Sequence, residues 1–158
     1  MKHILSSLKY LTALFLFSAM ILLLLGLGLR SFSCINMAIN FTILYFGGIV
    51  LPFTIHETAH FELMKRLHVP AKVERKLWRI SIIPLRDLQP IEQIKIALAG
   101  SSITGGIGGV LLFIGYIVNS GILIILAYFY LMHFVFLLPC FGDGRAILQA
   151  ACKKFRRS

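Results

Sequence analysis

Charged residues are scarce in this sequence, and acidic residues are the scarcest of them. Only 14% of the 158 residues are charged, with six Asp or Glu against 16 Lys or Arg, while 58% are hydrophobic. This balance excludes an ordinary soluble domain and a disordered tail alike. The three cysteines are an odd number, so they provide no disulfide framework. The composition therefore suits a chain in an apolar environment such as a membrane.

Four apolar stretches approach the roughly 20 residues with which a helix crosses a bilayer core about 30 Å thick. They cover residues 11–28, 35–55, 94–118 and 122–138. We therefore expect an all-α polytopic membrane protein with about four transmembrane helices. The first stretch is too long for a signal peptide and has no small-residue cleavage site after it, so we expect it to be retained.

The domain organisation that follows is a single membrane-embedded unit over residues 1–158. It consists of an extra N-terminal helix at 10–29, a core at 35–150 and a basic tail at 151–158. The connection at 68–93 includes "LWRISIIPLR" (77–86), an isoleucine-rich run that partly alternates. This pattern favours one or two short strands, with a surface amphipathic segment as the alternative.

Positive charge is concentrated at one end of the expected helices. Apart from Lys2, Lys9 and Arg30, every Lys and Arg lies within 65–95 or 145–157, and the net charge is +10. Because Lys and Arg mark the cytoplasmic side, we expect a multi-pass protein of the cell membrane with both termini and the long connection in the cytoplasm. Anionic lipid headgroups, rather than nucleic acid, are the expected partner of this charge.

Two features should shape the helices around the centre of the chain. Pro52 removes a backbone donor and should kink or loosen the second helix one turn before His56. The third stretch carries small residues, among them Gly100, Gly105 and Gly109. Small residues allow close packing of helices in a membrane, and we expect the second helix to be the neighbour.

The stretch "HETAH" (56–60) places two histidines and a glutamate at the end of an apolar run. His56 and His60 project from one helical face, one turn apart, which suits two nitrogen ligands of a tetrahedral metal site. Glu57 is rotated by about 100° along the helix, so it can reach a metal-activated water without being a ligand. His-Glu-x-x-His is the metalloprotease signature for these reasons. The sequence therefore predicts a Zn²⁺ site with Glu57 as the general base.

A catalytic zinc takes a third protein ligand. The acidic candidates are Glu62, Glu74, Glu92 and Asp143. Glu62 points to another helical face, and the two glutamates of the connection have Lys and Arg neighbours to pair with. Ile35 to His56 and Ile122 to Asp143 are both 21 residues apart, or about 32 Å of helix. This equal depth favours Asp143, with Glu92 as the alternative.

Three segments together resemble the site-2 protease family of intramembrane zinc metalloproteases, in the family's order. They are "HETAH" (56–60), "IALAG" (96–100) and "LLPCFGDGRAIL" (137–148), and the resemblance covers roughly residues 45–150. The chain has Val135 where the family usually has an asparagine, Pro139 alone where prolines are paired, and Ser101 where a proline is common. It is therefore identified as a divergent, minimal member.

The resemblance implies that His56, His60 and Asp143 hold Zn²⁺, while Glu57 is the general base of a metalloendopeptidase. The substrate would be a membrane protein, cut in or near a transmembrane segment, with strands of the connection as a candidate substrate edge. His133 is a candidate for oxyanion stabilisation, or else a histidine bonded within the helix bundle. A regulatory membrane partner is a further expectation. The alternative function is a non-catalytic metal-binding membrane protein, either a transporter component or a scaffold.

Overall fold

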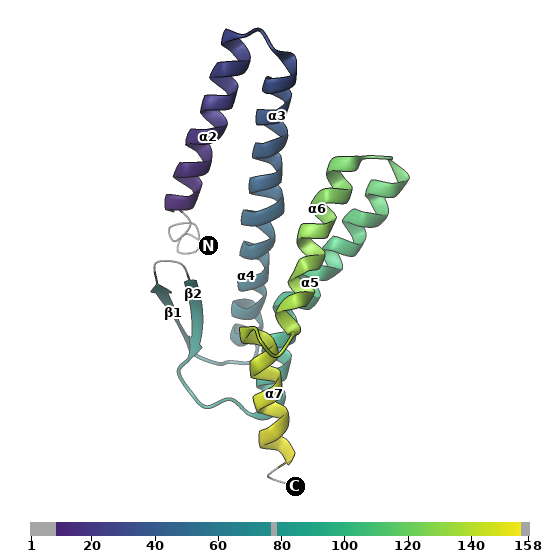
Figure 1. Ribbon diagram of the computed structural model, residues 1–158. Coiled ribbons are helices and arrows are strands. Elements are labelled where there is room, and N and C mark those ends of the chain that lie inside the picture. The colour runs from purple at the N-terminus through teal and green to yellow at the C-terminus, as the bar shows by residue number, and fades with distance from the viewer. Residues whose placement is uncertain (1–8, 77–78, 156–158) are drawn as a thin grey trace.

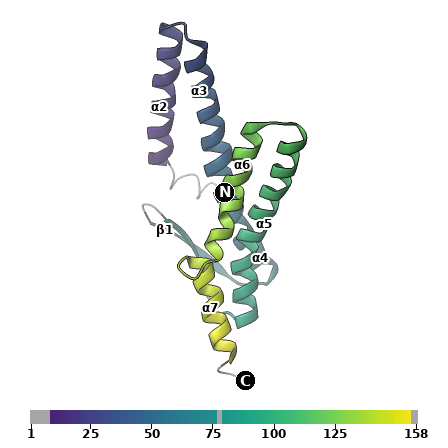
Figure 2. The same ribbon diagram turned by 45° about the vertical axis from the view of Figure 1, so that its right-hand side comes forward.

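The computed structural model describes residues 9–76 and 79–155. Two helical hairpins point to the same end of the molecule, while a strand pair and the last helix lie at the other end (Figures 1 and 2). The first hairpin joins α2 (Lys9–Gly28) to α3 (Phe32–Ile43). Its turn places Arg30 in the left-handed region at φ 50°, and Ser31 caps α3.

The helix that carries "HETAH" is one long rod with a widened turn in its middle. α3 continues through a π-helical segment, η1 (Leu44–Val50), into α4 (Leu51–Arg66). Pro52 has no N–H to donate, and just before it the N–H of Leu51 bonds to the carbonyl of Phe46, as a π-helical turn requires. The expected loosening of the helix before His56 is thus confirmed.

The connection after α4 forms an antiparallel strand pair, β1 (Ala71–Lys76) and β2 (Arg79–Pro84), with Ala71 opposite Pro84. The strand expected within 77–86 is confirmed over β2, and residues 77 and 78 lie outside the described part. The pair is anchored by the buried Met64, Val69 and Ile96, against which Ile82 packs. Burial of these side chains holds the hairpin beside the C-terminal half of α4.

The second helical hairpin joins α5 (Pro90–Ile117) to α6 (Gly121–Leu131). Beyond Leu131 the helix tightens into a 3₁₀ segment, η2 (Met132–Leu137), and Leu138 is extended, as the residue before a proline prefers to be. α7 (Gly142–Phe155) follows. The last stretch is therefore less regular than expected, and the basic tail begins inside α7; residues 156–158 are not described.

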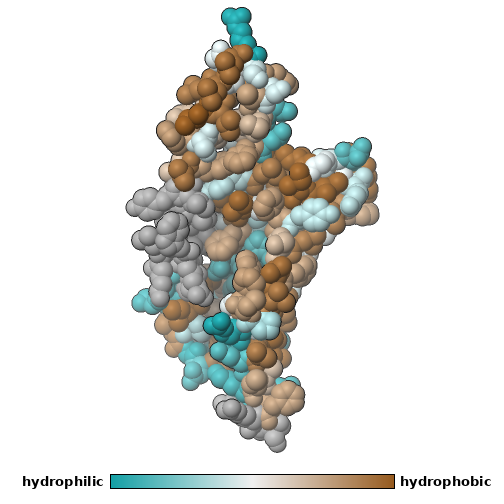
Figure 3. Space-filling model, in the orientation of Figure 1, coloured by the Kyte–Doolittle hydropathy of each residue, from teal (hydrophilic) through white to brown (hydrophobic). Residues whose placement is uncertain are grey.

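Three described helices are long and apolar enough to cross a membrane: Phe32–Arg66, Pro90–Ile117 and Gly121–Phe155. The N-terminal helix has a shorter apolar part, Thr12–Gly28, so a fourth span stays a prediction. Apolar side chains cover much of the visible face of both helical hairpins (Figure 3). The surface indicates a membrane protein.

The small residues of α5 contact two neighbours rather than one. Gly100 lies against the rings of His56 and His60, as expected for packing on the second helix. The expectation is wrong for Gly105, which lies against Phe134 of η2, and for Gly109, where nothing lies within 4 Å of the position that a Cβ would take. α5 is packed between α4 and the α6–η2 segment, so close approach is needed on both sides.

Candidate metal centre

Two imidazole rings of α4 form the inner part of the site. His56 and His60 are 3% and 7% exposed. Their Nε2 atoms lie 3.1 Å apart, and the rings meet edge to face at an interplanar angle of 87°. The four-residue spacing on a regular helix thus brings two ligand-type nitrogens to one point.

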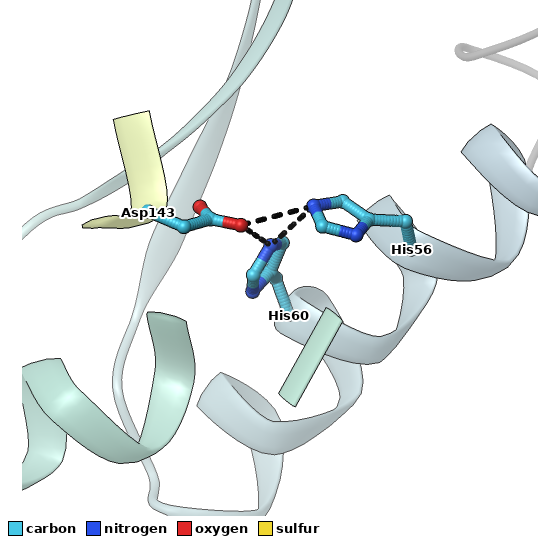
Figure 4. Close-up of side chains that lie close together, drawn as sticks. All are labelled: His56, His60 and Asp143. Carbon is cyan, nitrogen blue, oxygen red and sulfur yellow. Dashed lines mark hydrogen bonds and ion pairs between the residues drawn. The ribbon is translucent and has the colours of Figure 1, made fainter. Parts of the chain in front are cut away.

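Asp143 reaches the same point from the first turn of α7 (Figure 4). Its Oδ2 atom lies 3.1 Å from Nε2 of His56 and 3.4 Å from Nε2 of His60. The proximity expected from equal helix depth is therefore confirmed. Whether the three side chains hold zinc stays a prediction.

The backbone around Asp143 is held from two sides. A Cβ on Gly144 would collide with the carbonyl oxygens of Leu137 and Leu138, so only glycine allows α7 to start this close to η2. On the next turn, Gln93 Nε2 of α5 donates to the carbonyl oxygen of Ala146 at 2.9 Å. These contacts fix the start of α7 relative to α5 and hence the position of the carboxylate.

The second nitrogen of His60 is also paired. Nδ1 lies 2.6 Å from the carbonyl oxygen of Ile96 on α5. Because a carbonyl oxygen can only accept, Nδ1 carries the proton and Nε2 directs a lone pair at His56 and Asp143. A backbone acceptor behind a ligating histidine is the usual way in which a metal site fixes its tautomer.

The donor set fits zinc. In a tetrahedral site with bonds of about 2.0–2.1 Å, two ligand atoms lie about 3.3 Å apart; the three observed separations are 3.1, 3.1 and 3.4 Å. Asp143 Oδ2 is buried and makes no hydrogen bond within the described part of the chain. Two nitrogens and a carboxylate oxygen this close together could hold a cation between them.

Glu57 lies beside this cluster and outside it. It is half-buried and lines the same cavity, of about 1020 Å³, as His56, His60 and Asp143. Residues of β2, the following loop, α5, η2, the turn after it and α7 form the rest of the cavity wall. The arrangement is that expected of a carboxylate able to move protons next to a metal.

Two of the other acidic candidates pair with arginines away from this cluster. Glu62 pairs with Arg66 at 3.6 Å on the exposed side of α4. Glu92 accepts two hydrogen bonds from Arg86, at 2.9 and 2.8 Å, and this pairing raises the pKa of Arg86. Among the described residues, the one group that could hold a metal ion is His56, His60 and Asp143. Neither Glu74 nor Glu92 belongs to it, so the alternative third ligand is not supported.

His133 and Phe136 complete the surroundings of His56. The centroid of the His133 ring, in η2, lies 5.2 Å from that of His56, and the centroid of Phe136 lies 5.4 Å from that of His56.

The sequence did not predict three of these contributors to the site: Phe136, Gln93 and the Ile96 carbonyl. A backbone carbonyl leaves no side-chain signal, and an aromatic residue in an apolar helix looks like any lipid-facing one.

Comparisons of the chain with family models, with curated proteins and with solved structures found no match. The case for a function therefore depends on the described residues themselves. They supply three convergent donor atoms, a carboxylate beside them and one cavity that reaches all four side chains.

Proposed function

We propose that this protein is an intramembrane zinc metalloendopeptidase of the site-2 protease type, which hydrolyses a peptide bond in or near a transmembrane segment of a membrane protein. One observation carries the proposal. Donor atoms of His56, His60 and Asp143 lie within 4.8 Å of one another, in the wall of a cavity that Glu57 also lines. This is the constellation that the metalloprotease signature is built to produce.

The residues have separate roles in this reaction. His56, His60 and Asp143 hold the ion, which when bound supplies Lewis acidity toward the scissile carbonyl and toward water. Glu57 accepts a proton from the attacking water and passes it to the leaving amide nitrogen. Both imidazoles are buried, which limits the contact of their side of the ion with bulk water.

The membrane arrangement has four spans, with α2 (Lys9–Gly28) as the first. Both termini, the strand pair and the metal centre are on the cytoplasmic side. The concentration of Lys and Arg within 65–95 and 145–157 supports this orientation, because such residues remain on the cytoplasmic side. Anionic headgroups then face the basic connection.

The substrate binds as an extended segment along β2. The two-stranded sheet pairs β2 with β1 on one side only, and Ile82, Ile83 and Pro84 of β2 line the cavity. A strand edge offers backbone hydrogen bonds to a peptide of any sequence. A transmembrane helix must unwind to use this edge, which exposes its peptide bonds to the metal centre.

The test is cleavage of a panel of tagged single-pass membrane proteins co-expressed with the chain. Glu57→Gln keeps the size of the side chain but removes the base, so we expect cleavage to be lost while the purified protein retains its zinc. Glu62→Gln, on the exposed side of the same helix, should leave both unchanged. Full cleavage by Glu57→Gln would remove the proposed base. Zinc binding with no cleavage of any panel member would favour a transporter component or scaffold.

A further inference from the structure

His133 has one ring nitrogen that is paired and one that is not. The residue is 7% exposed, in η2. Its Nδ1 lies 3.2 Å from the carbonyl oxygen of Phe129, which can only accept, so Nδ1 carries the proton. Nε2 then presents a lone pair, and it is buried without a hydrogen-bond partner in the part of the chain that the structure describes.

His56 also has an unpaired ring nitrogen, and this one needs an acceptor. Its Nε2 faces His60 and Asp143, so a metal bound there leaves the ring proton on Nδ1. That Nδ1 is buried and has no hydrogen-bond partner among the described residues. His60 differs, since the Ile96 carbonyl lies behind its Nδ1. One of the two ligand histidines therefore lacks the acceptor that the other has.

The two unpaired nitrogens belong to neighbouring rings. The centroids of His56 and His133 lie 5.2 Å apart, with the ring planes tilted by 46°. One ring needs an acceptor and the other offers one, and leaving both unpaired in a buried place is unfavourable. A rotation of the rings, or a single water between them, would join the pair.

We propose that His133 is a positioning residue of the metal centre, whose Nε2 accepts a hydrogen bond from Nδ1–H of His56. The proposal rests on the metal site of the proposed function and adds to it. His133 holds His56 in the tautomer and orientation that direct Nε2 at the ion, as the Ile96 carbonyl does for His60. Each ligand histidine is then held by a hydrogen bond at its Nδ1.

This role differs from stabilising an oxyanion, which requires contact with the substrate. Phe136 lines the cavity, whereas His133 is not among the described residues that do so. The Phe136 ring contacts both histidines, at centroid distances of 5.4 Å to His56 and 5.2 Å to His133. His133 thus acts through His56 and not on the substrate.

The experiment is a Co²⁺ titration of the purified full chain in detergent, followed by the d–d absorption of the bound ion. His133→Phe keeps a ring but has no acceptor, and we expect it to weaken Co²⁺ binding by about 10–100-fold and to alter the spectrum. His133→Gln can place an oxygen near the position of Nε2, so affinity and spectrum should return close to those of the wild type. His133→Asn reaches only as far as Nδ1 and should resemble the Phe variant.

Two controls separate the possible outcomes. His68→Asn alters an exposed histidine at φ 54°, a conformation that asparagine tolerates, and should bind Co²⁺ as the wild type does. Unfolding of the metal-free variants shows whether each is folded. If the wild type itself binds no Co²⁺, the proposed function fails. If the wild type binds and His133→Phe matches it, or if the Gln variant is as weak as the Phe variant, the positioning role is wrong while the metal site stands.

Discussion

Gly100 of α5 faces His60 of α4 so closely that a Cβ at position 100 would lie 2.5 Å from Nε2 of that ring. It would also lie 2.8 Å from Cε1 of His56. Real Cβ atoms essentially never come closer than 3.0 Å to another group. The backbone of α5 therefore approaches both imidazoles closely, at Nε2 of His60 and Cε1 of His56, and only glycine at position 100 leaves room for this approach.

Gly100→Ala should therefore displace the two rings and weaken zinc binding by at least tenfold. Alanine is a better helix former than glycine by about 1 kcal/mol, so the loss cannot come from a weaker α5. Zinc affinity of the purified protein, measured by competition with a chelating dye, checks the prediction.

Gly106→Ala is the matched control, because it makes the same substitution on the same helix where nothing lies within 4 Å of the new Cβ. Its zinc affinity should equal that of the wild type. Equal affinity in the Gly100→Ala protein would mean that the histidine rings are not held against α5 as described.

Asp143→Asn should lower zinc affinity by more than the loss of about 10–100-fold that is typical of residues behind the ligands. The amide is similar in size but carries no negative charge to offset the ion. Glu92→Gln should retain the full zinc content, because Glu92 is bonded to Arg86 and lies outside the donor cluster. Metal analysis of the two purified variants beside the wild type distinguishes them; the opposite pattern would make Glu92 the third ligand.

Zinc should also stabilise the folded protein, since its donors on α4 and α7 come together only when the chain is folded. At a free zinc concentration of 100 times Kd, the free energy of unfolding should rise by about 2.7 kcal/mol. Reversible denaturation in detergent, with and without zinc, measures the change. His56→Ala should abolish it, and an equal gain in that variant would place the stabilising ion elsewhere.

The sequence predicted the parts of the site that follow from local periodicity. His56 and His60 share a face because a helix repeats every 3.6 residues, and Asp143 lies near them, as the equal spacing from the starts of two apolar stretches suggested. The partly alternating run "LWRISIIPLR" (77–86) likewise predicted one or two short strands. These inferences need only the geometry of single elements.

What the sequence could not predict depends on which elements pack together. The π-helical turn of η1 fits Gly47 and Gly48 against Leu126 and Phe129 of α6, and nothing in the local sequence names that neighbour. Gly105 was expected to contact the second helix, but it lies against Phe134 of η2. The carbonyl of Ile96 became a partner of His60 only once α5 lay against α4.

Gln93 offers a test of how firmly the carboxylate is positioned. Its Nε2 donates to the Ala146 carbonyl at 2.9 Å and so ties the first turns of α7 to α5, next to Asp143. Gln93→Leu keeps the bulk but removes the donor, and a hydrogen bond of this kind contributes about 1 kcal/mol. If most of that energy serves to hold Asp143 in place, zinc affinity should fall about fivefold, while both histidines remain as they were.

The control for this variant is Gln149→Leu, which changes an exposed glutamine on α7 itself. It should leave zinc affinity unchanged, because the side chain is exposed and lies beyond the first turn of α7. A Gln93→Leu protein that binds zinc as tightly as the wild type would mean that Gly144, packed against the carbonyls of Leu137 and Leu138, is enough to fix Asp143. A similar loss of zinc affinity in both variants would instead indicate that a new leucine at either position is enough to disturb α7.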